Sequence, residues 1–280
     1  MISPRALTCT SAAFPASHSA PQAYARALLT IAPCPSMPCC SISKLPSRRH
    51  SFLENVLSFG KVPHGSNSSP LSRVVKFLKQ LNLYTIFDNV LNTADFGIPQ
   101  QRERVYMVGI QTRLIRLPFQ WPDRIRATRL SKFWDRTATG RIVKSREVPQ
   151  DLLLKKTSFV NLRKAWKDMV KLGLNPEQTD AIVDIGAGKG YGSFRIGECP
   201  TITPGRGKGF GFYSTMLTRP LSLTEMMRLQ GADPKKIDLS IISKTQAAGV
   251  IGNAMSVNLM EAIIVSILVA VGGPDALPFN

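Results

Sequence analysis

The sequence predicts an α/β fold, because segments typical of strands and of a helix alternate along its middle part. Residues 51–53 are short and apolar, as in a strand. Apolar residues then recur at helical spacing over residues 71–81, after a Ser-Pro pair that suits a helix start. Residues 85–91 and 105–110 have the composition of two further strands. Strand, helix and strand in this order indicate an α/β domain.

Three helices are predicted in the rest of the chain. One covers residues 161–172, and two closing helices cover residues 222–231 and 256–271. A glycine-rich stretch, residues 186–211, lies between the first helix and the other two. The hydrophobic fraction of 44% is typical of a chain with a packed core.

The first 53 residues contain no Asp or Glu and are rich in Ala, Ser and Pro. An organellar transit peptide has this composition, and so does a low-complexity leader or a wrongly assigned exon. On any of these interpretations, we expect residues 1–50 to form a leader without a fixed structure.

Positive charge is concentrated in one part of the chain. Lys and Arg number 36 against 18 Asp and Glu, which gives a formal net charge of +18. Residues 111–176 hold 16 of these cations against 5 acidic residues, a local net charge of +11. Such a surplus favours a polyanion such as double-stranded DNA, because each neutralised phosphate releases counterions. An ordinary solvated basic surface is the alternative.

The cysteines give no support for a metal site or a disulfide framework. There are five, an odd number, and none has the spacing of a zinc site. The longest apolar run, residues 262–272, is too short to span a membrane and suits a buried helix. We therefore expect neither a metal nor a membrane partner.

The most informative run extends from Ala94 to Val105. In a strand, its Gln100, Arg102 and Arg104 project to the same face. Two guanidinium groups held side by side form a permanently charged donor array that suits a phosphate or a base carbonyl. The run resembles the Gly-x-Pro-Gln-x-Arg-x-Arg motif of the DNA cytosine-5 methyltransferase family.

Four further segments occur in the order that this family has. They resemble its Glu-Asn-Val motif, the end of its target-recognition region, its Arg-Leu-Gln-Gly helix and the Gly-Asn-Ala motif that opens its last helix. The segments are Phe52-Leu53-Glu54-Asn55-Val56, Pro200-Thr201-Ile202-Thr203 with Arg206-Gly207, Arg219-Pro220-Leu221-Ser222 through Arg228-Leu229-Gln230-Gly231, and Gly252-Asn253-Ala254-Met255. The resemblance implies a truncated Rossmann-like methyltransferase core (51–110), an inserted target-recognition region (111–218) and closing helices that return to the core (219–280).

The resemblance also implies roles for particular residues. Methylation at carbon 5 of cytosine needs attack at carbon 6, which is easier when ring N3 is protonated by a carboxyl group in a dry pocket. The family gives this role to the Glu of its Glu-Asn-Val motif, here Glu54, with Arg104 near the base and Arg102 supporting. If the family's geometry is kept, we expect these three side chains to converge, with the carboxylate and a guanidinium group within hydrogen-bonding reach. Arg206 and Gln230 would contact nucleic acid.

The nucleophile in this family is the cysteine of a Pro-Cys motif. Pro38-Cys39 resembles that motif, which makes Cys39 the candidate. Only 14 residues separate Cys39 from Glu54, however, and parallel strands need a crossover of about a dozen or more residues besides the strand itself. Residues 44–50 include Pro46 and cannot supply that helix.

The family uses S-adenosylmethionine, and Asn253 is the one cofactor contact that the resemblance gives. Nothing in residues 1–33 resembles the family's Phe-x-Gly-x-Gly loop or its ribose-binding acid. Residues 182–190 resemble the strand and glycine loop of other Rossmann-like methyltransferases, but they fall where the recognition region belongs. A glycine-rich turn near DNA is the alternative for that stretch.

Three functions stay open on the sequence alone. The chain is a DNA cytosine-5 methyltransferase that needs a further part, a catalytically inactive DNA-binding remnant, or a tRNA-directed relative. In a eukaryote we expect it in the nucleus, or in a plastid or mitochondrion if the leader is a transit peptide.

Overall fold

The structure is a computed structural model that describes residues 29–30, 49–144, 156–239 and 241–273. Most of the leader expected over residues 1–50 lies outside these ranges, and so does Cys39. The remaining candidate residues are all described.

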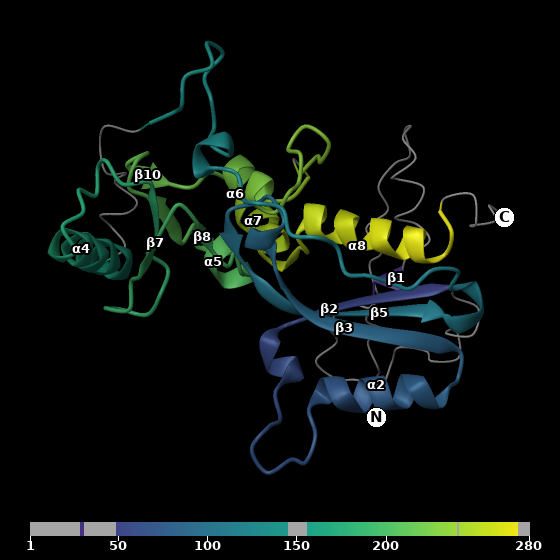
Figure 1. Cartoon of the computed structure of the whole chain (residues 1–280). Coiled ribbons are helices and arrows are strands. Elements are labelled where there is room, and N and C mark those ends of the chain that lie inside the picture. Colours follow the sequence, from purple (N-terminus) through teal and green to yellow (C-terminus); the bar gives the residue numbers. More distant parts are fainter. Residues whose placement is uncertain (1–28, 31–48, 145–155, 240, 274–280) are drawn as a thin grey trace, which may run out of the picture.

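A four-stranded sheet forms the first part of the fold (Figure 1). Its strand order is β1-β2-β5-β3, with β1 parallel to β2, and with β5 antiparallel to both β2 and β3. The strands are β1 (Leu29–Thr30), β2 (His50–Asn55), β3 (Tyr84–Asn92) and β5 (Glu103–Gln111). The strands expected at 85–91 and 105–110 are thus confirmed. The strand expected at residues 51–53 is β2, and it is longer than expected because its pairing with β5 continues through Glu54 and Asn55.

One helix covers each face of this sheet, as Figure 1 shows for α2 (Pro70–Gln80) and α8 (Val257–Ala270). The helix α2 begins where expected, since the Ser69 side chain accepts a hydrogen bond from the Ser72 amide. Alternate side chains of the strands face opposite helices. Leu53 and Met107 belong to the cluster around α2, and Phe52 and Val108 to the cluster around α8. The α/β fold predicted from the sequence is therefore confirmed.

A second sheet, which the sequence pattern did not predict, lies in the expected recognition region (residues 111–218) except for its last strand, β10. Its order is β10-β9-β6-β7, and every pairing is antiparallel. The helix α4 (Lys156–Lys171) packs on it through Leu162 and Ala165, which join Val183 and Tyr213 in one cluster. The predicted helix is confirmed, although it begins at Lys156. The strands are β6 (Ala181–Asp184), β7 (Phe194–Ile196), β9 (Phe212–Ser214) and β10 (Arg219–Pro220).

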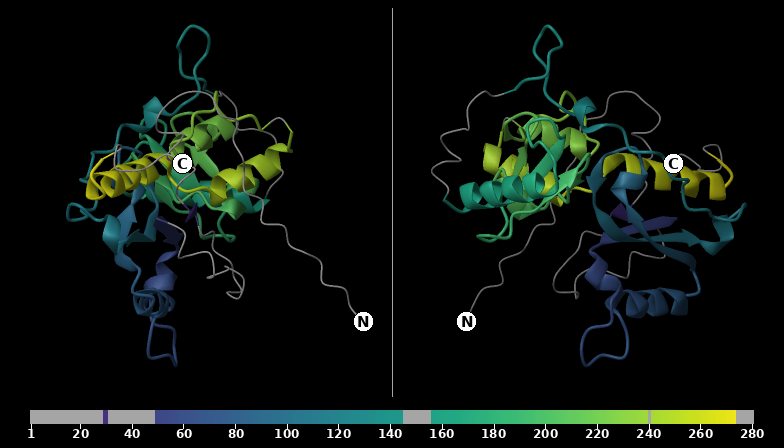
Figure 2. Two further views of the ribbon diagram at one scale, coloured as in Figure 1. Left: turned by 90° about the vertical axis from the view of Figure 1, so that its right-hand side faces the viewer. Right: turned by 60° about the vertical axis from the view of Figure 1, so that its left-hand side comes forward.

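The two sheets lie in separate parts of the fold (Figure 2). Short helices and one strand pair connect these parts. The strand β4 (Gln100–Gln101) is parallel to β8 (Cys199–Pro200), so the arginine motif pairs directly with the end of the recognition region. A large apolar cluster includes residues of the first part, the recognition region and the closing helices. The helices here are α5 (Pro204–Lys208), α6 (Leu223–Leu229) and α7 (Lys244–Asn253).

The helices α5 and α7 pack closely because glycines face the contact. A Cβ atom on Gly252 would overlap the Thr203 backbone, and one on Gly207 would overlap the Ala248 backbone. The helix α6 confirms the closing helix that the sequence predicts over residues 222–231. The helix α8, which begins after Ser256, confirms the closing helix predicted over residues 256–271, and the Gly-Asn-Ala motif directly precedes it. The structure adds that Gly252 and Asn253 also end a separate helix, α7. The chain turns between the two helices because Ala254 is extended.

One helical stretch, Lys244–Ala270, is long and apolar enough to cross a membrane by length and composition. It comprises α7 and α8, with the turn at Ala254 between them. The buried side of α8 packs on the first sheet through Leu259, Ile263 and Ile267. A core helix passes the same test, so this finding is weak evidence for a membrane.

Candidate active site and recognition region

Glu54, Arg102 and Arg104 converge at one end of the first sheet. Glu54 lies near the end of β2, opposite Tyr106 of β5. Arg102 Nη2 donates to Glu54 Oε1 at 3.4 Å, and Arg104 Nε lies 3.6 Å from the same oxygen. The convergence expected from the sequence is confirmed, whereas the catalytic roles of these residues stay predictions.

The carboxyl group of Glu54 is in a nearly dry environment, with 11% of its side chain exposed. Burial raises the pKa of Glu54, and the two guanidinium groups oppose this rise without cancelling it. Burial also lowers the pKa of Arg104, with Arg102 acting in the same direction. A carboxyl group with a raised pKa is suited to hold a proton and to donate it.

Two buried polar atoms beside this carboxyl group have no partner among the described residues. They are the Tyr106 hydroxyl oxygen and Arg102 Nε. Burial raises the pKa of Tyr106, and the charge of Glu54 adds to this effect. Buried polar groups are nearly always paired in folded proteins. The described residues therefore leave these two atoms without a hydrogen-bond partner next to the Glu54 carboxyl group.

Gln100 connects this site to the recognition region. It is fully buried, and its Nε2 donates to the Leu229 carbonyl at 2.5 Å and to Gln230 Oε1 at 3.2 Å. Its Oε1 accepts from the Ile202 amide at 3.3 Å, and Arg102 Nη1 donates to the Ile202 carbonyl at 2.9 Å. The arginine motif thus fixes the end of the recognition region as well as the candidate site.

The family model described as C-5 cytosine-specific DNA methylase matches residues 50–268. The chain belongs to this family. Among curated methylases, it is 31% identical over 195 residues to the type II methyltransferase M.NgoBI of Neisseria gonorrhoeae, covering 68% of this chain and 52% of that protein. It is 30% identical over 227 residues to M.HhaI of Haemophilus parahaemolyticus, covering 77% of this chain and 62% of that protein. The chain thus spans a little over half the length of these relatives.

Solved methyltransferase structures are also similar to this chain. The Entamoeba histolytica methyltransferase EhMeth has 18% sequence identity and a TM-score of 0.48, covering 85% of this chain and 74% of that one. The S. pombe Dnmt2 methyltransferase has 13% identity and a TM-score of 0.47, covering 80% of this chain and 68% of that one.

The two residues expected to contact nucleic acid occupy different environments. Arg206 is half-buried, and its Nε lies 2.8 Å from Asp184 Oδ1. Gln230 is 1% exposed, and its Nε2 donates to the Ile251 carbonyl at 2.9 Å. The contacts of both residues with DNA stay predictions, and the burial of Gln230 favours a structural role.

The described residues do not by themselves fit S-adenosylmethionine. Asn253, the expected cofactor contact, is exposed at the end of α7. An open groove of about 570 Å³ lies between α2 and β3, and neither Glu54 nor Asn253 lines it.

The glycine stretch after β6 leads into the antiparallel strand β7 rather than into a helix, so it is not a Rossmann-type loop. Among the described residues, no group of His, Cys, Asp and Glu could hold a metal ion.

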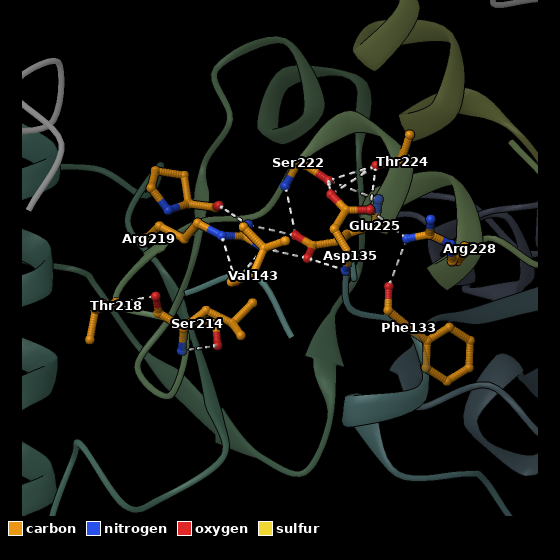
Figure 3. A network of polar contacts seen from close by, with 12 residues as sticks. Phe133, Asp135, Val143, Ser214, Thr218, Arg219, Ser222, Thr224, Glu225 and Arg228 are labelled. Carbon is orange, nitrogen blue, oxygen red and sulfur yellow. Dashed lines mark hydrogen bonds and ion pairs between the residues drawn. The ribbon is translucent and has the colours of Figure 1, made fainter. Parts of the chain in front are cut away.

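A charged network that the sequence reasoning missed joins α6 to the recognition region (Figure 3). The two terminal guanidinium nitrogens of Arg219, Nη1 and Nη2, donate to the fully buried carboxylate of Glu225 at 2.8 and 2.6 Å. The carboxylate of Asp135 accepts from Ser222, Thr224 and Arg228. The Ser222-x-x-Glu225 capping box is the sequence signal for part of this network. Asp135 carries no such signal, because its partners lie far along the chain.

Proposed function

We propose that this chain supplies the target-base pocket and the DNA-recognition part of a DNA cytosine-5 methyltransferase. The supporting observation is the buried carboxyl group of Glu54 between two guanidinium groups. In this role, Glu54 holds a proton at ring N3 of cytosine while carbon 6 is attacked. Arg104 lies near the base and Arg102 holds Glu54 in position. S-adenosylmethionine, when bound, supplies the methyl group.

The target base must leave the stack before this pocket can hold it. The pocket is tested with two duplexes that differ in one unpaired base, either cytosine or thymine. A protonated carboxyl group donates to N3 of cytosine, whereas thymine presents a donor at N3. We expect tighter binding of the duplex with unpaired cytosine, measured by fluorescence anisotropy, and loss of this preference in Glu54→Ala. Equal affinities for the two duplexes in the unsubstituted chain contradict the proposal.

We expect DNA binding to weaken steeply as salt rises. The described recognition region carries exposed cations, including Arg163 and Lys167 of α4. If about five cations contact phosphates, log K should fall with log salt at a slope of roughly −4 to −5. A flat dependence would identify the charge cluster as an ordinary solvated surface. An RNA duplex of the same sequence in the same titration tests the tRNA-directed alternative.

We expect this chain alone not to bind S-adenosylmethionine with micromolar affinity. The glycine loop and the ribose-binding acid of the family have no counterpart in residues 1–33, and Asn253 alone cannot enclose a cofactor. Isothermal titration calorimetry measures this directly. Micromolar binding would contradict the prediction. It would make residues 186–190 the candidate cofactor loop, and Gly188→Val would then test whether this loop binds the cofactor.

A further inference from the structure

The strand β3 forms one edge of the first sheet, and its outer side pairs with no strand in the described part of the chain. It is nine residues long, contains neither lysine nor proline, and pairs with β5 without a bulge. Edge strands of natural proteins are usually shortened or interrupted by such features, because an open edge attracts another extended chain. The edge of β3 is therefore a place where a further strand can be added.

The hydrogen bonds between β3 and β5 show which backbone groups of β3 point outward. The Thr112 amide donates to the Leu83 carbonyl at 3.0 Å, and the bonded side alternates from residue to residue along an antiparallel ladder. Odd-numbered residues of β3 therefore bond to β5, and even-numbered residues present their amides and carbonyls at the edge. The central residues of this second set are Ile86, Asp88 and Val90. The Val90 amide donates to the Asn89 side chain at 2.8 Å, a local bond that an added strand can replace.

The open groove of about 570 Å³ lies beside this edge, between β3 and α2. Leu71 and Val75 line it with half-buried apolar side chains, and Lys76 and Lys79 line it with exposed cations. Helical spacing places these residues on neighbouring positions of one face of α2. A peptide strand paired with β3 would direct every second side chain toward this groove. The groove thus suits a segment that carries both apolar and acidic side chains.

Positive charge around the groove has few counter-charges. Residues 55–87 contain four Lys and Arg but no Asp or Glu, and Asp88 is the one acidic residue that lines the groove. Arg73, Lys76 and Lys79 of α2 form no ion pair with any residue that the structure describes. The first 53 residues also lack acidic side chains, and a second copy of the chain carries the same net charge of +18. The complementary occupant is therefore an acidic segment of another protein.

We propose that the β3 edge and this groove bind an acidic, extended segment of a partner protein as an added strand. Main-chain hydrogen bonds to β3 hold the segment, and its side chains select it. Its carboxylates pair with Lys76 and Lys79, and its apolar side chains pack on Leu71 and Val75. A nucleic acid fits less well, because its phosphate backbone offers neither apolar side chains nor groups that continue a sheet. The helix α2 lies on the face of the first sheet opposite α8 (Figure 1), and the inference does not depend on the proposed function.

The test uses a fluorescein-labelled peptide of alternating glutamate and valine, with the same nine residues as β3, and fluorescence anisotropy with the full chain. The peptide is expected to bind, and a peptide of alternating lysine and valine is not. Combining Lys76→Glu with Lys79→Glu should lower the affinity about tenfold or more, because two attractions become repulsions. The matched control combines Lys235→Glu with Lys236→Glu, the same change of charge at exposed residues outside the groove, and should change the affinity little.

Strand addition is tested by changing the peptide and leaving the protein intact. Two peptides carry N-methyl groups on alternate amides, so that each loses the hydrogen-bond donors of one edge. One of them should lose binding, and the other should bind like the parent peptide, because only one edge faces β3. Equal binding of both methylated peptides would show that no strand is added.

Two further results would overturn the inference. The first is a failure of the glutamate and valine peptide to bind the unsubstituted chain. The second is equal affinity for a peptide of alternating glutamate and serine, together with displacement of the parent peptide by oligothymidylate. That result would identify a general polyanion surface in which the apolar side chains of the groove have no part.

Discussion

Replacing Glu225 with alanine is expected to lower the free energy of unfolding by about 3–5 kcal/mol. The carboxylate of Glu225 is fully buried and accepts from four donors, two on Arg219 and the amides of Asp135 and Ser222. Only 14% of the Arg219 side chain is exposed, so the substitution leaves a largely buried guanidinium group without its counter-charge. Chemical denaturation followed by circular dichroism measures the change.

A matched control is Glu261→Ala, the same chemical change at an exposed position of α8. It should shift the denaturation midpoint little, because surface substitutions rarely matter. Loss of Glu225 should also loosen residues 133–143, because Arg219 holds the Val143 carbonyl and Glu225 holds the Asp135 amide. Faster tryptic cleavage after Arg136 or Arg141 would show this. Equal stability of both variants would mean that the network is not important for the fold.

Local sequence patterns predicted the elements whose signals are complete within one segment. The helix α2 has an amphipathic repeat and the Ser69-Pro70 start, and β3 and β5 are long enough for their composition to be informative. The convergence of Glu54 with the two arginines followed from the family motifs, because strand pairing brings distant segments to one sheet end. The proximity of these three residues was therefore predictable.

Contacts between distant segments determine the features that were missed. The helix α7 contains Gly249 and Gly252, which are poor helix formers and are needed only because α5 packs closely. Its Ser243-x-x-Gln246 capping box is the one local signal that could have revealed it. The second sheet consists of strands of two to four residues, too short for a period of two to be visible. The side chain of Asn161 in α4 donates to the carbonyls of Ile185 and Ala187 in the turn after β6, and no local pattern predicts this contact.

Contacts between distant segments also join the expected recognition region to the proposed base pocket. Arg102 binds both the Glu54 carboxylate and the Ile202 carbonyl, so one guanidinium group belongs to the pocket and to the end of the recognition region. Gln100 adds bonds to Leu229 and Ile202. A displacement of the recognition region therefore alters the position of Arg102, and through it the surroundings of Glu54.

Glu54→Gln is expected to slow methyl transfer by about 10²–10⁴-fold in a domain completed with its cofactor-binding part, while this chain stays folded. The amide keeps an acceptor for Arg102 but has no acidic proton to give to ring N3. Burial raises the pKa of Glu54, so folding favours the protonated form. The stability that this preference contributes is present below the ordinary pKa of Glu and is lost as pH rises through the raised value. Glutamine is neutral at every pH, so the variant keeps this stability as pH rises.

The two chains should therefore be similarly stable at acidic pH, and the glutamine variant should become the more stable one as pH rises above the ordinary range of Glu. Denaturation curves collected across this pH range measure the difference, with Glu261→Gln as the control for the loss of one negative charge. A glutamine variant that is less stable than the unsubstituted chain at neutral pH would show that ion pairing outweighs burial at Glu54. The carboxylate would then serve to neutralise the two arginines, and its assignment as the proton donor would be wrong.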